Sequence, residues 1–452
     1  FYERSLDLTT GESVRSIKWE SPKGIKLDLI FRRFVSLDNE HIFVQKVELL
    51  CDKDANIIIE SGIDGSVTNS GAMHFEDIQR RVYEGRYMEY IAKTTQSNVK
   101  IIQGAVCSLN KEASAIPVMG RRTLANRYSI KIKANEKLEF EKKSIFFSER
   151  DKEFAHLQDE NRFDEIKRES AKLIRELETQ SYNELFKRSE AKWQDYFEKS
   201  KIDIGTDDIY VKTSINFALY HLRIMVKTDD NRVGIGAKAL SGEGYKGHSF
   251  WDTELFILLK KLDISKYKNS EAVLGIYNDY NTKQLNEYMV SKQSDTVILL
   301  YLFRDLFDHE TRKKNFVFYE DKTLHDSSLS KSTHAILANE FDFEDMSYKL
   351  FKGAISVDLG PNMKSSDDGI HSASIGGIWA AFVFGFGGAN IEGKGLSINP
   401  CLPAGWDFLE FPLVYQGTRL RVRVEKDNQV SVRRLDGKSV EIYIKGEKQL
   451  IK

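Results

Sequence analysis

The sequence predicts a multidomain protein of mixed α and β structure, in which a β-sandwich, a helical linker, a helical domain and a small β domain follow one another. Three observations predict this order. Strand-like alternation fills residues 1–150, helical periodicity takes over up to about residue 390, and alternation then returns. The 452 residues are enough for about three domains of ~150 residues each.

The composition is that of a folded protein with no strong charge bias. Hydrophobic residues make up 41% of the chain and charged residues 30%. The 67 basic and 68 acidic residues nearly cancel, which gives no electrostatic reason to expect a nucleic-acid or membrane partner. The cysteines Cys51, Cys107 and Cys401 are odd in number and far apart, so no disulfide framework and a cytoplasmic location are expected.

Residues 1–150 are predicted to form the N-terminal β-sandwich. Several runs in this part alternate or stay apolar over the length of a strand, and Gly- and Asn-rich turns separate them. Short strands at regular spacing are typical of sandwiches. The runs are 24–35, 41–51, 56–61 and 128–147, the last with a turn near Asn135.

Residues 151–205 are predicted as a helical linker, because charged residues there alternate with apolar stripes at helical spacing. Residues 206–390 carry helices with wide apolar faces, and some are apolar nearly all round. Such helices pack on two sides, as in a helical barrel or a double layer of helices. The helical runs are 210–225, 295–307, 332–341 and 375–384.

Residues 391–452 are predicted to form a small C-terminal β domain. The segments 420–424 and 440–444 alternate cleanly between apolar and polar side chains.

Trp251 and Asp252 combine an aromatic ring with a carboxylate at the end of a Gly-rich segment. Such a pair suits a sugar subsite, because the ring stacks on the apolar face of a pyranose and the carboxylate accepts from two hydroxyls. The alternative is structural: Ser249–Asp252 also fits a capping box with the Trp in the core. The preceding Gly242–Gly247 matches G-x-G-x-x-G, but the strand and acidic residue of a dinucleotide site are missing.

Hydroxyl and imidazole groups precede two apolar helical runs. Ser327 and Ser328 precede one, and His371 precedes the other. Free N–H groups at a helix start bind anions, so the two segments together suggest a phosphate pocket; taken singly, each could be a plain helix cap. Lys292 and Gln293 open another helix, where they could grip a sugar or phosphate or simply be solvated. No metal-ligand spacing is present.

These segments together resemble the family 65 glycoside phosphorylases, which include the maltose, trehalose, kojibiose and nigerose phosphorylases. Five motifs occur in the order of that family, and the resemblance runs over nearly the whole chain. The motifs are Ala239–His248 with Phe250–Glu254, Lys292–Asp295, His325–Ser330, Asp368–His371 with Ser374, and Asn399–Pro400 with Leu402–Pro403.

The resemblance implies an (α/α)6 barrel for residues 206–390. It also implies inverting phosphorolysis of an α-glucosyl disaccharide, with a kojibiose-like substrate favoured, to β-glucose 1-phosphate and a free sugar. Inorganic phosphate would be the co-substrate, no cofactor or metal is expected, and a homodimer is the expected assembly. The implied substrate-binding residues are Trp251, Asp252, Lys292 and Gln293, and the implied phosphate-binding residues are Ser327, Ser328 and His371.

The general acid of the resembled family is absent from this sequence. An inverting enzyme needs a carboxylic acid to protonate the leaving oxygen. In the family it is a Glu in a Gly-Pro-Asp-Glu-Tyr type of segment between the Trp-Asp and Lys-Gln motifs. Only residues 255–291 separate these motifs here, and no such segment occurs. Glu287 directly abuts the Lys-Gln motif and is not accepted, so the catalytic acid is unknown.

The junction of the missing part is placed near Leu258–Lys261. Twelve helices with their connections need about 200 residues, which is more than residues 206–390 provide. The barrel is therefore predicted to be incomplete, through a real internal deletion or through residues absent from this numbering. The chain as written is expected to be inactive, and the alternative function is a glucose-binding remnant. A hydrolase is disfavoured because His371 and the two serines stand where it needs a base.

Overall fold

The computed structural model describes residues 1–227, 230, 232, 236–239, 241–242, 279, 291, 293–325, 327–360, 369–393 and 395–452. The chain divides into two compact units, Phe1–Glu198 and Lys199–Lys452. Within the described ranges, no helix is long and apolar enough to cross a membrane.

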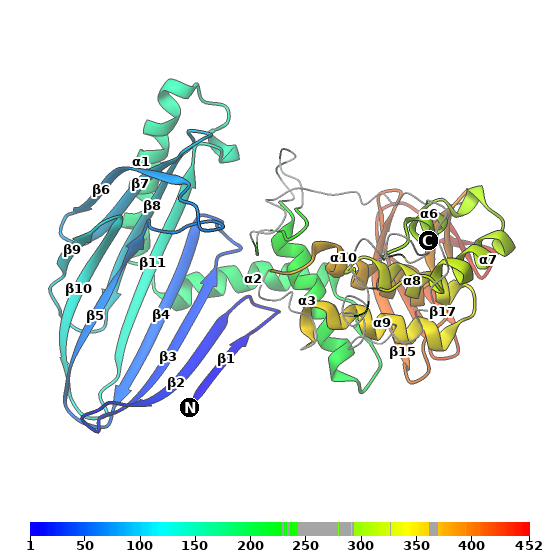
Figure 1. The fold of residues 1–452 in the computed structure, drawn as a ribbon, viewed down its shortest axis with the longest axis horizontal. Coiled ribbons are helices and arrows are strands. Elements are labelled where there is room, and N and C mark those ends of the chain that lie inside the picture. The colour runs from blue at the N-terminus through cyan, green and yellow to red at the C-terminus, as the bar shows by residue number, and fades with distance from the viewer. Residues whose placement is uncertain are drawn as a thin grey trace. The chain divides into compact units, whose positions relative to one another are not determined.

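The first unit contains an antiparallel sheet of eight strands and a second sheet of three (Figure 1). The larger sheet has the order β1 (Tyr2–Leu6), β2 (Ser13–Glu20), β3 (Lys26–Val35), β4 (Ile42–Cys51), β11 (Leu138–Ser148), β8 (Lys100–Leu109), β7 (Tyr87–Thr94) and β6 (Phe75–Tyr83). The smaller has the order β5 (Ala55–Asp64), β10 (Thr123–Ile132) and β9 (Ile116–Gly120). The predicted β-sandwich is confirmed, and each predicted strand run falls on an observed strand.

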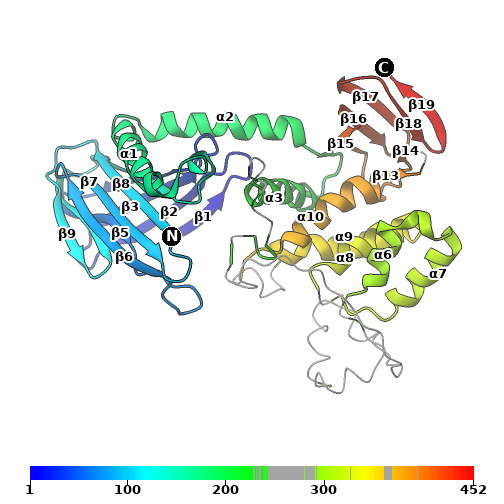
Figure 2. The same ribbon diagram turned by 90° about the horizontal axis from the view of Figure 1, so that it is seen from above.

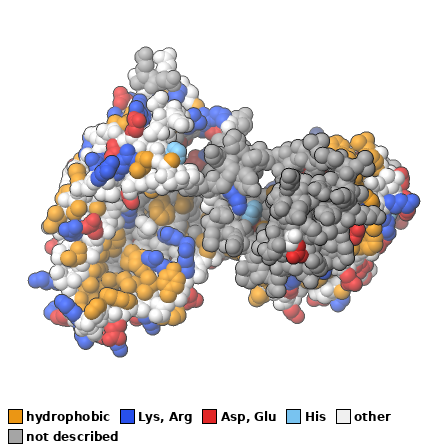
Figure 3. Space-filling view, in the orientation of Figure 1, with side chains coloured by type: hydrophobic (Ala, Val, Ile, Leu, Met, Phe, Trp, Pro, Cys, Tyr) orange, Lys and Arg blue, Asp and Glu red, His pale blue; other side chains and the backbone are white. Residues whose placement is uncertain are grey.

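The two sheets share an apolar core because β10 alternates strictly between buried and exposed residues. Its Tyr128, Ile130 and Ile132 pack with Leu138 and Phe140 of β11. The smaller sheet contacts β6, β7 and β8, and strands β1 and β2 extend the larger sheet beyond it (Figure 1). Apolar side chains gather on this face of the unit, with Lys and Arg side chains beside them (Figure 3).

Two helices cover the other face of the eight-stranded sheet (Figure 2). They are α1 (Asp159–Glu178) and α2 (Tyr182–Ser200), both within the predicted helical linker. Phe163 and Ile166 of α1 are buried in one cluster with sheet residues such as Phe34. The Tyr182 hydroxyl of α2 donates a 2.8 Å hydrogen bond to Glu12. Packing on the sheet, rather than helical propensity alone, therefore stabilises the linker helices.

The second unit begins with a helical region that corresponds to the predicted helical domain. Its described helices are α3 (Ile209–Met225), α6 (Asp295–Leu302), α7 (His309–Glu320), α8 (Ser330–Glu340), α9 (Glu344–Leu359) and α10 (Ser372–Ala380). A π-helical turn, 381–386, continues α10. Helix α10 packs against α3, α8 and α9. Helix α8 buries nearly every residue from Ser330 to Asn339, as expected for a helix that is covered on several sides.

The small C-terminal β domain is also confirmed. One four-stranded sheet contains β12 (Asp203–Ile204), β15 (Phe408–Tyr415), β16 (Thr418–Glu425) and β17 (Val430–Asp436). The other contains β13 (Ala389–Glu392), β14 (Gly395–Ile398), β18 (Val440–Ile444) and β19 (Glu447–Ile451). Trp406 joins this domain to the helices, because its buried ring packs against Phe351, Phe382 and Phe386.

Candidate functional site

The described candidate residues all lie at the starts of helices, as the sequence predicts. Gln293 lies two residues before α6, and the hydroxyl of Ser294 between them accepts from the Val297 amide at 3.4 Å. Ser327 and Ser328 lie just before α8, and His371 is the residue that caps α10. The candidate side chains therefore lie near helix ends whose first N–H groups lack partners within the helix, although neither α8 nor α10 has a side-chain cap.

Gln293 and Ser327 are in direct contact. The Ser327 hydroxyl donates to the side-chain oxygen of Gln293 and accepts from the Leu329 amide at 3.2 Å. Backbone hydrogen bonds hold the two segments together, from the Ser291 amide to Lys322 (2.9 Å) and from the Leu324 amide to Ser291 (2.8 Å). A short parallel bridge therefore places the Lys-Gln motif beside the double-serine motif. The Ser328 hydroxyl makes no hydrogen bond within the described residues.

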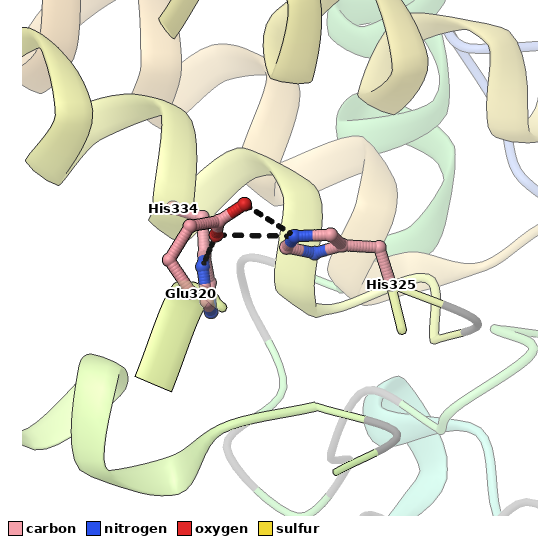
Figure 4. A group of neighbouring side chains, drawn as sticks. All are labelled: Glu320, His325 and His334. Atoms are coloured by element: carbon pink, nitrogen blue, oxygen red, sulfur yellow. Dashed lines mark hydrogen bonds and ion pairs between the residues drawn. The ribbon is translucent and has the colours of Figure 1, made fainter. Parts of the chain in front are cut away.

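Glu320, His325 and His334 form a buried network (Figure 4), and His325 lies two residues before Ser327 in the sequence. One oxygen of Glu320 lies 2.5 Å from Nδ1 of His334 and 3.1 Å from Nε2 of His325. The other ring nitrogen of His325 lies 2.7 Å from the Ser330 hydroxyl. Because an ionised carboxylate can only accept, both histidines donate to Glu320, and His325 accepts from Ser330.

The network anchors the turn that carries Ser327 and Ser328. His325 has a positive φ of 57°, a left-handed conformation that is unfavourable for a residue with a Cβ atom. Its ring hydrogen bonds to Glu320 and Ser330 stabilise this conformation from both sides. These three side chains are also metal-ligand types, as are Glu40, His41 and Glu153 in the first unit. Hydrogen bonds alone explain the arrangement of Glu320, His325 and His334, so this arrangement gives no reason to infer a metal ion.

The protonation of this network predicts a pH-dependent stability. Burial lowers the pKa of His325 to about 4. Burial alone would raise the pKa of Glu320, but hydrogen bonds from both histidines bring it well below its usual range. An unfolded His binds a proton near pH 6.5, so between about pH 6.5 and 4 the unfolded state binds more protons. Stability is thus complete above pH 6.5 and falls as the pH approaches 4.

We expect urea unfolding of the second unit to show this loss, by about 3 kcal/mol at most for His325. In His325→Gln the slope of stability against pH between 6.5 and 4 should flatten. An unchanged slope in this variant would assign the pH dependence to other groups.

His371 is the centre of a second polar group. Its Nδ1 lies 2.9 Å from a carboxylate oxygen of Asp358, in the last turn of α9, and its Nε2 lies 2.8 Å from Nζ of Lys238. Asp358 can only accept and a charged Lys238 can only donate. His371 is therefore neutral, with its proton on Nδ1. Lys238 is 6% exposed, and its ammonium also donates to the Gly369 carbonyl at 3.4 Å.

A close backbone approach positions Lys238 beside His371. Gly369 has φ +94°, and a Cβ atom there would lie 2.8 Å from the amide nitrogen of Gly242. Only glycine fits this position without strain. The Ser241 hydroxyl accepts from the Ile370 amide (2.9 Å), and the Ser372 hydroxyl donates to the Gly236 carbonyl (2.7 Å). The segment before the Gly-rich motif is thus bound to the segment that begins α10.

Two buried polar atoms lie on the helices next to His371. The Ser374 hydroxyl, on the first turn of α10, is buried and has no hydrogen-bond partner in the described part of the chain. The same holds for Nδ1 of His221 on α3, and burial lowers the pKa of His221 to about 4. Buried polar atoms without partners are uncommon in folded proteins and favour sites that bind a ligand or water.

Three residues of the candidate site are not predicted from the sequence: Lys238, Glu320 and Asp358. Lys238 directly precedes the Ala239–His248 motif, and its place beside this Gly-rich segment is its one local signal. Glu320 and Asp358 end helices, where a carboxylate opposes the helix dipole, and that is their one local signal. Trp251, Asp252, Lys292 and the junction Leu258–Lys261 lie outside the described residues.

Comparison with known proteins shows that this chain is similar to several disaccharide phosphorylases. A kojibiose phosphorylase of Halothermothrix orenii is 27% identical, over 98% of this chain and 85% of that protein. An α,α-trehalose phosphorylase of Thermoanaerobacter brockii is 39% identical over 43% of this chain and 25% of its own length. Among solved structures, a protein from human microbiome titled a putative kojibiose phosphorylase has a TM-score of 0.87 at 17% identity, over 100% of this chain and 84% of its own.

The comparisons also mark a break inside the helical domain. The alignment to the Halothermothrix orenii protein runs over 669 positions, although this chain has 452 residues, so long segments of that relative have no counterpart here. The profile of the central catalytic domain matches in two pieces, residues 216–259 and 256–380. The pieces meet at the predicted junction.

Family profiles account for most of the chain. The N-terminal domain of glycosyl hydrolase family 65 matches residues 1–196, its central catalytic domain matches the two pieces between 216 and 380, and its C-terminal domain matches residues 390–451. The three domains stand in the order of the observed sandwich, helices and C-terminal sheets. The chain belongs to glycosyl hydrolase family 65, a family of enzymes.

Proposed function

We propose that this site serves the inverting phosphorolysis of an α-glucosyl disaccharide, a kojibiose-like one in the first place, to β-glucose 1-phosphate and a free sugar. The observation that carries the proposal is the pairing of Lys238 with His371 at the start of α10. Phosphate is a charged nucleophile and needs cationic and hydrogen-bond donating groups rather than a catalytic base. The named relatives, which are phosphorylases, support the same reaction class.

Phosphate is proposed to bind at Lys238 and His371, with Ser327 and Ser328 as further contacts. To donate to phosphate, the Ser327 hydroxyl must give up its hydrogen bond to Gln293. Lys238 supplies the positive charge. Nε2 of His371 accepts from Lys238 in the structure; once protonated it donates to phosphate instead, with Asp358 stabilising the imidazolium. The Ser328 hydroxyl and the amides of the first turn of α8 are available to an anion.

The glucosyl unit is proposed to lie against Trp251 and Asp252, with Lys292 and Gln293 as the other substrate contacts. Of these, the described Gln293 supports the assignment, because its side-chain oxygen accepts from Ser327 and so links the sugar contacts to the phosphate contacts. The proposed assembly is a homodimer.

Loss of the Lys238 charge is expected to weaken phosphate binding. Hydrogen bonds to charged groups contribute ~1.5–3 kcal/mol, so Lys238→Met should raise the Kd for inorganic phosphate about 10- to 100-fold. Calorimetric titration of the whole chain measures this directly. Lys212→Met, at an exposed position of α3, is the matched control and should bind phosphate like the parent. Equal Kd values in Lys238→Met and the parent would contradict this phosphate site.

A second candidate function is a glucose-binding remnant without turnover. The missing general-acid segment favours it, since no carboxylate in residues 255–291 stands in the family's motif. Titration with glucose separates the possibilities: binding of glucose and phosphate without reaction supports the remnant, and absence of both indicates a barrel too incomplete to bind.

A further inference from the structure

A groove on the N-terminal unit has no role in the phosphorolysis described above. It has a volume of about 500 Å³ and is lined by residues of β1–β4. Strands β1 and β2 extend the larger sheet beyond the smaller one (Figure 1), and apolar side chains gather on this face with Lys and Arg side chains beside them (Figure 3). The floor of the groove is apolar because alternate residues of neighbouring strands share one face. Register aligns Phe31 with Val47, and Val47 with Phe140. Ile57 and Ile59 of β5 form the opposite wall.

Cationic side chains surround this apolar floor. Arg4 and Arg15 stand directly opposite each other on β1 and β2, and Arg15 stands opposite Phe31 on β3. Arg33 and Lys142 occupy the next row, on either side of Gln45. Like charges directly opposite each other destabilise a sheet. Their placement around one groove therefore favours an anion that neutralises them.

Three of these guanidinium groups lack a counter-charge. Arg4, Arg15 and Arg33 make no hydrogen bond or ion pair within the described residues, and the Nε atom of Arg15 is buried without a partner there. The Arg15 guanidinium instead lies 4.2 Å above the ring of Phe31. By contrast, the neighbouring Arg32 is paired with Glu12 at 3.2 Å.

The acidic side chain in the lining of the groove, Glu60, is already occupied. It accepts from Arg127 at 2.7 and 2.9 Å, so it does not neutralise the groove. Apart from Glu60 and the cationic side chains, the lining is mostly aliphatic and aromatic, with Gln45 as its side-chain amide and Ser13 and Ser61 as its hydroxyls. Sugar sites need several carboxylates or amides to bind hydroxyls, whereas this groove offers an apolar surface beside free guanidinium groups.

We propose that this groove binds a small amphipathic organic anion, with a carboxylate or phosphate head at Arg15, Arg4 and Arg33 and an aliphatic or aromatic body on Phe31, Val47 and Phe140. The volume lies in the range of ligand pockets, which is ~300–1,000 Å³. The site is independent of the proposed phosphorolysis, since its residues belong to the sandwich. Guanidinium groups bind planar carboxylates and phosphates in a bidentate manner, which suits either head group.

Calorimetric titration of the whole chain with octanoate tests the proposal. Octanoate should bind with one-to-one stoichiometry and more weakly at high salt. Acetate, which has the head alone, and octanol, which has the body alone, should each bind at least about tenfold more weakly. Octyl phosphate in place of octanoate tells which head group the three arginines prefer.

The variants locate the binding. Arg15→Gln with Arg33→Gln should weaken octanoate at least about tenfold, and Arg121→Gln, an exposed arginine outside the groove, should leave it unchanged. Thermal unfolding of the double variant should stay close to that of the parent, because no ion pair is lost and relief of the Arg4–Arg15 repulsion offsets the lost contact of Arg15 with Phe31. Absence of binding by both anions, or equal binding in the double variant, would overturn the proposal. The proposal would also be overturned if neither anion binds and the parent is a dimer that dissociates in the double variant. A second copy of the chain would then occupy the groove.

Discussion

The 452-residue chain is expected to release no measurable glucose 1-phosphate from kojibiose, maltose, nigerose or trehalose in the presence of phosphate. The departing sugar must take a proton as the glycosidic bond breaks, and the segment that supplies it in the family has no counterpart here. General acid catalysis contributes ~10²–10⁴-fold. Loss of the surrounding barrel segment lowers the rate further, because it removes contacts that orient the substrate.

The measurement follows glucose 1-phosphate by a coupled assay, with a full-length family 65 phosphorylase as the positive control. Turnover within tenfold of that control would show that another carboxylate acts as the acid. The missing segment would then not make the chain inactive.

Replacement of Glu320 by alanine is expected to lower the free energy of unfolding more than any other single change near the site. The carboxylate accepts from two buried histidines, His325 and His334, and their exposed fractions are 8% and 0%. Without it, two buried N–H groups lose their acceptor, at ~1–3 kcal/mol each. The truncation also leaves a cavity, so a total loss of about 3–5 kcal/mol is expected.

Urea unfolding of the second unit measures this effect. Glu310→Ala on the exposed face of the same helix is the matched control and should change stability by less than about 1 kcal/mol. Glu320→Gln keeps the size and one acceptor and should fall between the two. A loss in Glu320→Ala as small as in the control would show that the buried network does not stabilise the double-serine turn.

Most of the fold could be predicted because local patterns and packing agree. The strict alternation of Leu420–Val424 and of Val440–Ile444 gave strands at observed positions, as β16 and β18. The helical run 210–225 corresponds to α3, Ile209–Met225, which Asp208 caps through the amides of Tyr210 and Val211. Apolar periodicity signals such elements directly, since the same residues form the core.

The sequence indicates candidate site residues only where several polar side chains stand close together in the sequence, next to a helix start. Ser327, Ser328 and His371 were singled out because each precedes a helix, and their role in phosphate binding stays a prediction. Lys238 and Asp358 could not be found, since they meet His371 across 133 and 13 residues of chain respectively. Neither distance leaves a periodic pattern, and the role of a charged residue depends on the partner that folding brings to it.

The pairing of Ser327 with Gln293 illustrates the same limit. It depends on an isolated parallel β-bridge between Ser291 and Thr323. A single bridge involves too few residues to show the alternating pattern of a strand. The groove around Arg15 was likewise hidden, because each arginine alone resembles a solvated side chain, and only the register of β1, β2 and β3 places them together.

We propose that the chain retains the glucosyl and phosphate halves of a phosphorylase site but lacks its acid. The most direct test is the reaction of α-glucosyl fluoride with phosphate, because fluoride leaves as an anion and needs no proton from a general acid. We predict that β-glucose 1-phosphate and fluoride form in equal amounts, above the background rate, and that Lys238→Met raises the phosphate concentration at half-maximal rate about 10- to 100-fold. Formation of no β-glucose 1-phosphate from the fluoride, in a chain that still binds glucose and phosphate, would contradict the claim.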